Sequence, residues 1–123
     1  MITKILSYRD LKAWQEGRSL AKLVYLQLRR FPKYEQFGIS DQMRRAVVSV
    51  PSNIAEGFGR ATAKEKNQFY HIAKGSLAEL ETQSYIAFDI DYIDEKTLNE
   101  ILQQSDLTSK LLHGLIKSNK ERI

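Results

Sequence analysis

Cysteine is absent from the 123-residue chain, so neither a disulfide framework nor a thiolate metal site can form. The chain has only two histidines, and neither belongs to a Glu-x-x-His or His-x-x-x-His pair of the kind that binds metal in helical bundles. We therefore expect no metal site and no cofactor. The Gly-x-Ser-x-Gly turn of many hydrolases is also missing. We expect no catalytic residues and no enzyme activity.

Long apolar runs are missing as well. The uncharged stretch at residues 46–55 is about half of the ~20 residues that are needed to cross a bilayer, so we expect no membrane contact. The first ten residues hold no apolar run as long as that of a secretory signal. The lack of cysteine is compatible with a reducing compartment. We expect a cytoplasmic protein.

The residues that are present are typical of a single folded domain, which we expect to span residues 1–123. The chain is 42% apolar and 28% charged. Its charge is uneven, because residues 1–66 hold 13 Lys and Arg against 6 Asp and Glu, whereas residues 67–123 hold 6 against 9. Such a basic half either meets an anionic partner or packs against the acidic half of an identical subunit.

Apolar residues recur at intervals of three and four along four segments, which is typical of amphipathic helices. The pattern predicts helices at about residues 8–31, 40–58, 63–89 and 95–117. Helices of this length joined by short loops favour an all-α, up-down-up-down four-helix bundle. We expect Tyr25 and Ile72 on the core stripes of the first and third helices.

Pro51 interrupts the second predicted helix. A proline inside a helix loses one backbone hydrogen bond, so we expect a kink near residues 49–51, or else two shorter helices that meet there. Gly59 is expected to end this helix in a left-handed conformation. Residues that can accept backbone N–H groups precede each helix: Ser7 or Asp10, Ser40 or Asp41, Thr62 in a capping box with Glu65, and Asp94.

Two glycines and the C-terminal end complete the expected fold. Gly57 and Gly75 are interpreted as positions where a side chain would prevent the close approach of two helices. The polar residues 118–123 are expected to be disordered.

Basic residues on the first two helices and the start of the third are the candidates for binding nucleic acid. Arginine pairs with phosphate oxygens through two N–H groups, and such contacts need no base-specific readout. The alternative is that these are ordinary solvated residues, with Glu56 and Arg60 forming a local ion pair. The candidate residues are Arg44, Arg45, Arg60, Lys64, Lys66, Arg18, Lys22 and Arg29.

A second set of polar residues follows one side of the helix that contains Pro51. They either form a buried cluster that fixes helix register or contact another subunit. In the loop after the first helix, Tyr34 and Phe37 are additional candidates for an interface. The polar set consists of Gln42, Ser49, Asn53, Glu56 and Glu79.

Three motifs resemble one family. They are Gln42-x-Arg44-Arg45-Ala46 with Ser49 and Asn53-Ile-Ala-Glu-Gly-x-Gly-Arg60, then Phe69-x-x-x-Ala73-x-Gly75-Ser-Leu-x-Glu-Leu80, and Asp10-Leu-x-x-Trp14-x-x-Gly17. They are similar to the bacterial four-helix-bundle proteins encoded in intervening sequences of large-subunit ribosomal RNA genes, often labelled ribosomal proteins. The resemblance covers nearly the whole chain.

The resemblance implies a left-handed four-helix bundle that assembles into a homopentamer, without known enzyme activity. The accessory proteins of diversity-generating retroelements look like relatives; they are pentameric bundles with a basic surface that bind nucleic acid and a reverse transcriptase. We therefore expect an oligomeric protein that binds RNA or structured DNA. The alternative is a protein-interaction scaffold whose charged residues contact neighbouring subunits or a protein partner.

Overall fold

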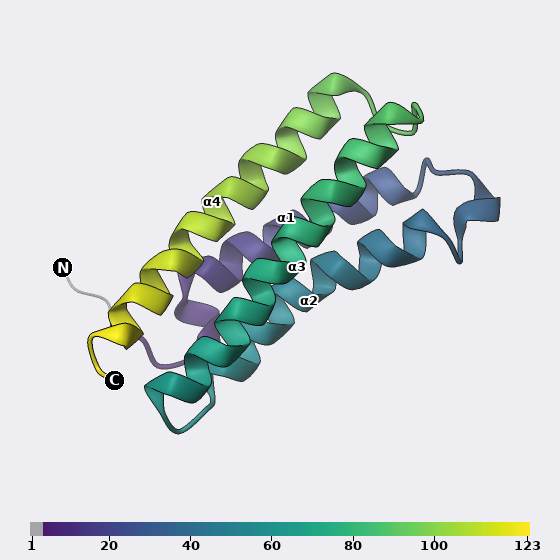
Figure 1. Cartoon of the computed structure of the whole chain (residues 1–123). Coiled ribbons are helices and arrows are strands. Elements are labelled where there is room, and N and C mark those ends of the chain that lie inside the picture. The colour runs from purple at the N-terminus through teal and green to yellow at the C-terminus, as the bar shows by residue number, and fades with distance from the viewer. Residues whose placement is uncertain (1–3) are drawn as a thin grey trace.

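The computed structural model describes residues 4–123 and consists of four α-helices with two short 3₁₀ turns. The helices are α1 (Lys12–Leu28), α2 (Ile39–Phe58), α3 (Ala63–Asp89) and α4 (Glu95–Lys120), and the turns are η1 (Tyr8–Asp10) and η2 (Lys33–Glu35). Each helix runs antiparallel to the next (Figure 1). Within the described chain, the helices approach one another in the order α1, α2, α3, α4 and back to α1, whereas diagonal pairs do not. The predicted all-α, up-down-up-down bundle is confirmed.

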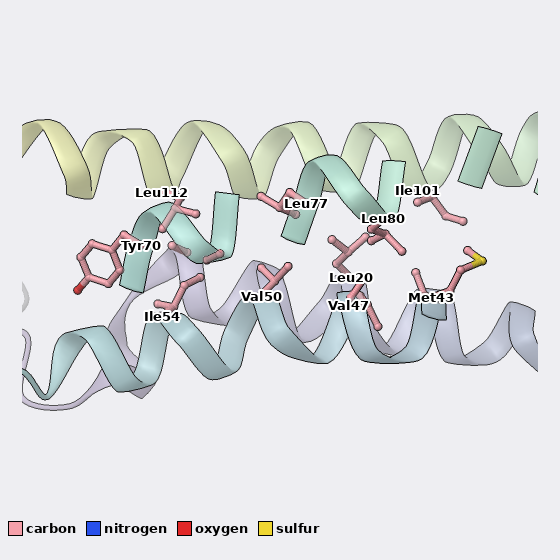
Figure 2. Close-up of a cluster of buried hydrophobic side chains, with 14 of the residues drawn as sticks. Leu20, Met43, Val47, Val50, Ile54, Tyr70, Leu77, Leu80, Ile101 and Leu112 are labelled. Carbon is pink, nitrogen blue, oxygen red and sulfur yellow. The ribbon is translucent and has the colours of Figure 1, made fainter. Parts of the chain in front are cut away.

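Apolar side chains at the predicted three- and four-residue spacing meet in one core between the helices (Figure 2). Every helix contributes because each buries one stripe of its surface. Leu20 of α1, Val50 of α2, Leu80 of α3 and Leu112 of α4 are all fully buried. Small polar residues also lie in this core, and Ser84 satisfies its hydroxyl by donating to the Leu80 carbonyl oxygen at 2.8 Å.

The first helix is shorter than predicted at both ends. Ser7 caps the separate turn η1, since its hydroxyl oxygen accepts the Arg9 N–H. Leu11 is extended, with φ −74° and ψ 126°, and this conformation separates η1 from α1. α1 ends at Leu28, three residues before the predicted end, and Arg29 and Arg30 form a turn ahead of Pro32.

Two of the predicted caps are confirmed and one is wrong. Thr62 accepts the Glu65 N–H at 3.1 Å at the start of α3, which is one of the two bonds of the predicted capping box; within residues 4–123 the reciprocal bond to the Glu65 carboxylate is not formed. Asp94 accepts the Thr97 N–H at 2.8 Å at the start of α4. The predicted cap at Ser40 or Asp41 is wrong, because α2 already begins at Ile39 and Gly38, which has no side chain, occupies the cap position. α4 ends at Lys120 rather than near residue 117.

One continuous helix, α2, runs through Pro51, so the alternative of two shorter helices is wrong. The kink near Pro51 and the left-handed twist of the bundle stay predictions. Gly59 does not adopt the expected left-handed conformation, since its φ is −80°. It ends α2 with its N–H donating to the Glu56 carbonyl oxygen at 3.2 Å, and the following Arg60 N–H donates to the Gly57 carbonyl oxygen at 3.1 Å.

Of the two glycines that were expected at close helix contacts, only Gly57 lies at one. A Cβ on Gly57 would lie 2.9 Å from the Phe69 Cβ and 2.9 Å from the Tyr70 Cε1, so α2 and α3 do approach closely there. The expectation for Gly75 is wrong, because within residues 4–123 no heavy atom outside its own helical surroundings would lie within 4 Å of such a Cβ. Gly75 lies on the exposed side of α3.

Three further expectations need correction. Tyr25 and Ile72 were predicted in the core but are 40% and 52% exposed. Both lie at the edge of their helix stripes, where a neighbouring helix covers only part of the side chain. The C-terminal residues are not disordered up to Lys120, because α4 continues and the Asn119 amide donates to the Asn67 Oδ1 at 2.9 Å. This buried pair holds the last turn of α4 against α3.

Candidate nucleic-acid interface

Two shallow hollows, of about 380 and 450 Å³, lie where α1 and α2 meet, and a third, of about 350 Å³, is lined by α1 residues and shares Trp14 and Arg18 with the first. No Asp or Glu lines any of them. The lining includes large aromatic side chains and basic side chains, which are the groups able to bind a nucleic acid. We call this set the α1–α2 face; it consists of Tyr8, Trp14, Arg18, Lys22, Tyr25, Arg44 and Arg45.

Arg18 and Trp14 form the centre of the α1–α2 face and line two of its hollows. The guanidinium carbon of Arg18 lies 5.6 Å from the centre of the indole ring, within cation–π distance. The ring of Tyr8 contacts the indole edge-on, with 5.2 Å between ring centres. Among residues 4–123, neither Arg18 nor Lys22 has a carboxylate within 4.0 Å. Both cations are therefore available to an anionic partner.

Arg44 and Arg45 share one carboxylate at the other end of the face. The Asp41 oxygens lie 3.3 Å from an Arg44 Nη and 3.1 Å from the Arg45 Nε. Arg44 also donates to the Gln36 carbonyl oxygen at 3.4 Å, and its side chain is 35% exposed. The Arg45 side chain is 82% exposed. Asp41 thus neutralises about one of the two charges, and Arg45 is the arginine that projects into solvent.

The other candidate cations lie elsewhere or are already paired. Arg60 bonds to Glu56 at 3.0 Å, as the alternative interpretation predicted, and its guanidinium lies 4.4 Å from the centre of the Phe69 ring. Lys66 donates to the carbonyl oxygen of Phe58, the last residue of α2. Arg29 and Lys64 are exposed, but neither lines the three hollows.

Part of the predicted polar set does form a cluster between α2 and α3. The Asn53 amide donates to the Ser49 hydroxyl and to the Ser49 carbonyl oxygen, both at 2.8 Å. The Ser49 hydroxyl lies 2.8 Å from the Ser76 hydroxyl of α3. This chain of hydrogen bonds fixes how α2 sits on α3.

The remaining members of the polar set lie outside that cluster. Gln42 is exposed. Glu56 is also exposed and pairs with Arg60. Glu79 is exposed on α3 and accepts a hydrogen bond from the Gln83 amide at 3.2 Å.

The loop aromatics lie at the far end of the bundle from the start of α1. Phe37 is 88% exposed and Tyr34 is 79% exposed. The Tyr34 hydroxyl lies 2.9 Å from the Tyr92 hydroxyl, which donates to a Glu35 carboxylate oxygen at 2.8 Å. Because both bonds hold the Tyr92 hydroxyl in its neutral form, the pKa of Tyr92 is raised.

The family model described as the 23S rRNA-intervening sequence protein matches residues 9–114. The chain belongs to this family. A crystal structure of a protein of unknown function from the S23 ribosomal protein family of Bacteroides thetaiotaomicron is similar to it in fold, with a TM-score of 0.77 and 23% sequence identity. The similarity covers 85% of this chain and 98% of that one. No curated protein matches the sequence.

Acidic and histidine side chains are dispersed in this family member. In the part of the chain that the structure describes, no three His, Cys, Asp or Glu side chains gather where they could hold a metal ion. None of the helices formed by residues 4–123 is long and apolar enough to cross a membrane.

Sequence reasoning missed the aromatic part of the candidate interface in this family member. Tyr25 was predicted on the core stripe of the first helix, yet it lines a hollow beside Arg44 and Arg45. Trp14 packs against the core and also lines two of the hollows. The signal was available, because Trp14, Arg18, Lys22 and Tyr25 are three or four residues apart and so share one side of α1. Ser76 was also missed as a partner of Ser49, and no local spacing could reveal a contact between residues 27 positions apart.

Proposed function

We propose that the protein is a non-catalytic, cytoplasmic module that binds RNA or structured DNA through the α1–α2 face. The observation that carries this proposal is the lining of the three hollows, which combines basic side chains with aromatic rings and includes no carboxylate. Within residues 4–123, Arg18 and Lys22 are unpaired, whereas Arg44 and Arg45 share Asp41. The family name refers to intervening sequences of 23S rRNA, which makes RNA the first nucleic acid to test.

The two kinds of side chain would act differently on a nucleic acid. Arg18, Lys22 and Arg45 would neutralise phosphates along the backbone, and the release of counterions makes such binding strongly salt-dependent. Trp14 and Tyr25 would stack on unpaired bases in loops or bulges. Both contacts are tolerant of base sequence, so we expect affinity for structured RNA with little sequence preference.

The test is fluorescence anisotropy with a labelled RNA hairpin that has an unpaired loop, titrated between about 50 and 200 mM salt. The variant R18Q/K22Q/R45Q removes three positive charges from the α1–α2 face. The control K96Q/K117Q/K120Q removes the same charge from exposed positions on α4. We expect the slope of log K against log salt to become shallower by about 2 to 3 in the first variant and to be unchanged in the control.

Two results would reject this function. One is the absence of binding to the RNA hairpin and to a DNA hairpin at the lowest salt concentration. The other is an equal loss of affinity in the two triple variants, which would show that only net charge matters and that no face is used.

A second candidate function, self-association into a scaffold, is favoured by exposed apolar side chains on α3. Ile72 and Ile86 are 52% and 47% exposed on the same side of α3. Gln83, on that helix, has a buried Oε1 that lacks a hydrogen-bond partner within residues 4–123. A contacting subunit would cover the two isoleucines and could supply the missing donor. The family resemblance implies a homopentamer, in which both functions can coexist.

Light scattering coupled to size exclusion tests this assembly. A pentamer of 14.2 kDa chains has five times that mass, about 71 kDa. We expect I72E/I86E to dissociate it, because two buried charges would lack partners. The control L107E, at a 43% exposed position on α4, should leave the mass unchanged. A wild-type monomer at micromolar concentration would contradict self-association.

A further inference from the structure

A cavity of about 230 Å³ is lined by residues at the end of α2, the end of α4 and the start of α3. Figure 1 shows these three helix ends at the same end of the bundle. Its apolar walls come from Ile5, Leu11, Phe58 and Leu115. Its polar lining comes from Lys66, Tyr70, Ser118, Asn119 and Arg122, and includes no carboxylate. This end cavity is separate from the α1–α2 face, so a ligand bound in it is independent of the proposed function.

The Tyr70 hydroxyl is a hydrogen-bond donor beside this end cavity. The Tyr70 side chain is only 2% exposed, and its hydroxyl points away from the leucines and valines of the core (Figure 2). Tyr70 lines the cavity, and within the described residues 4–123 its hydroxyl has no hydrogen-bond partner. Burial raises the pKa of Tyr70. The hydroxyl therefore stays protonated at neutral pH and offers an unused donor to the cavity.

Further donors line the same cavity. The Lys66 ammonium group uses one N–H for the Phe58 carbonyl oxygen and has two more. Among residues 4–123, Arg122 has no ion-pair partner, and it lies at the rim with Ser118. The Asn119 amide nitrogen is already bonded to Asn67. The lining thus combines two cations and a neutral donor with aliphatic and aromatic carbon.

We propose that the end cavity binds a small organic carboxylate with an apolar body. The carboxylate oxygens would accept from Tyr70, Lys66 and Arg122, and the body would pack against Leu11, Phe58 and Leu115. A cavity of about 150 Å³ is enough for benzene in another protein. The end cavity, at about 230 Å³, therefore accommodates one ring and a carboxylate but not a typical drug-sized molecule.

The test is binding of benzoate to the full chain, followed by amide chemical shifts in NMR spectra. We expect saturable shifts at millimolar benzoate that centre on the lining residues. The variant Tyr70→Phe keeps the ring and removes only the hydroxyl, so we expect its melting temperature to be unchanged and its dissociation constant for benzoate to rise about tenfold or more. The control Tyr85→Phe removes a hydroxyl from a 51% exposed side chain on α3 and should bind benzoate like the wild type.

Benzamide and inorganic phosphate test separately how much the apolar lining and the cationic lining contribute to binding. Benzamide has the ring without the charge, and phosphate has the charge without the ring, so both should bind more weakly than benzoate. Benzoate binding that Tyr70→Phe does not weaken would overturn the proposal. So would a lack of saturable shifts, or binding of either comparison ligand as tight as that of benzoate.

Discussion

Gly57→Ala tests a close approach of α2 to α3. The added Cβ would lie 2.9 Å from the Phe69 Cβ, 2.9 Å from the Tyr70 Cε1 and 3.1 Å from the Lys66 carbonyl oxygen. Real Cβ atoms essentially never approach as closely as 2.9 Å, and the 3.1 Å contact with the Lys66 backbone is also tighter than most. Because the Phe69 Cβ and the Lys66 carbonyl are tied to the α3 backbone, we expect α2 and α3 to shift apart.

The expected loss of stability follows from two opposing effects. Overpacking of this kind costs ~1 to 3 kcal/mol, and the better helix propensity of alanine offsets up to ~1 kcal/mol. We expect a net loss of ~1 to 2 kcal/mol. For a chain of 123 residues, each kcal/mol shifts the melting temperature by ~4 °C, so the midpoint should fall by ~4 to 8 °C.

Gly114→Ala is the matched control on α4. Within the described part of the chain, no heavy atom outside its own helical surroundings would meet a Cβ at Gly114, which is exposed. Only the helix propensity should act there, and the midpoint should rise by ~2 to 4 °C. Circular dichroism melts at equal protein concentration give both values. A Gly57→Ala protein that melts at or above the wild-type temperature would refute the close contact.

Three other variants test single contacts. Asn53→Ala should lower stability by ~1 to 3 kcal/mol in a denaturant titration, since the part-buried Ser49 hydroxyl and carbonyl lose a donor; an unchanged midpoint would contradict this. The Thr97 N–H lowers the pKa of the Asp94 carboxyl group in the folded protein. The ionised carboxylate therefore stabilises the folded protein fully above the pKa that Asp94 has in the unfolded chain, and this stabilisation is lost as the pH falls through the lower pKa of the folded state. Asp94→Ala should therefore melt below the wild type at pH 7, with the difference shrinking on acidification; a pH-independent difference would contradict it. Lys66→Gln should lower the melting temperature and leave RNA affinity nearly unchanged, whereas a shallower salt slope would return Lys66 to the interface.

The elements of the fold were readable from the sequence because they depend on local patterns. The spacing of Leu20, Val47 and Leu80 predicted helices, and Thr62 and Asp94 marked where two of them begin. Helix ends were less predictable, since they depend on the conformation of single residues. The extended backbone of Leu11 is one such case.

The site was only partly readable, because it depends on which side chains meet across helices. The pairing of Arg60 with Glu56 follows from their four-residue spacing. The bond from Lys66 to the Phe58 carbonyl oxygen crosses the turn between α2 and α3, and no spacing rule reveals it. Arg60 and Lys66 are thus engaged in contacts within the chain, whereas Arg18 has no ion-pair partner within residues 4–123. The sequence does not distinguish them, because all three are basic residues in the same half of the chain.

The fluorescence of Trp14 tests the α1–α2 face most directly. Trp14 is the only tryptophan in the chain and lines two of the three hollows. If RNA binds there, stacking or displacement of the Arg18 guanidinium should change the indole emission, with the same midpoint as the anisotropy of the labelled RNA. An anisotropy increase without any change in Trp14 emission would place the bound RNA on another surface and contradict the proposed interface.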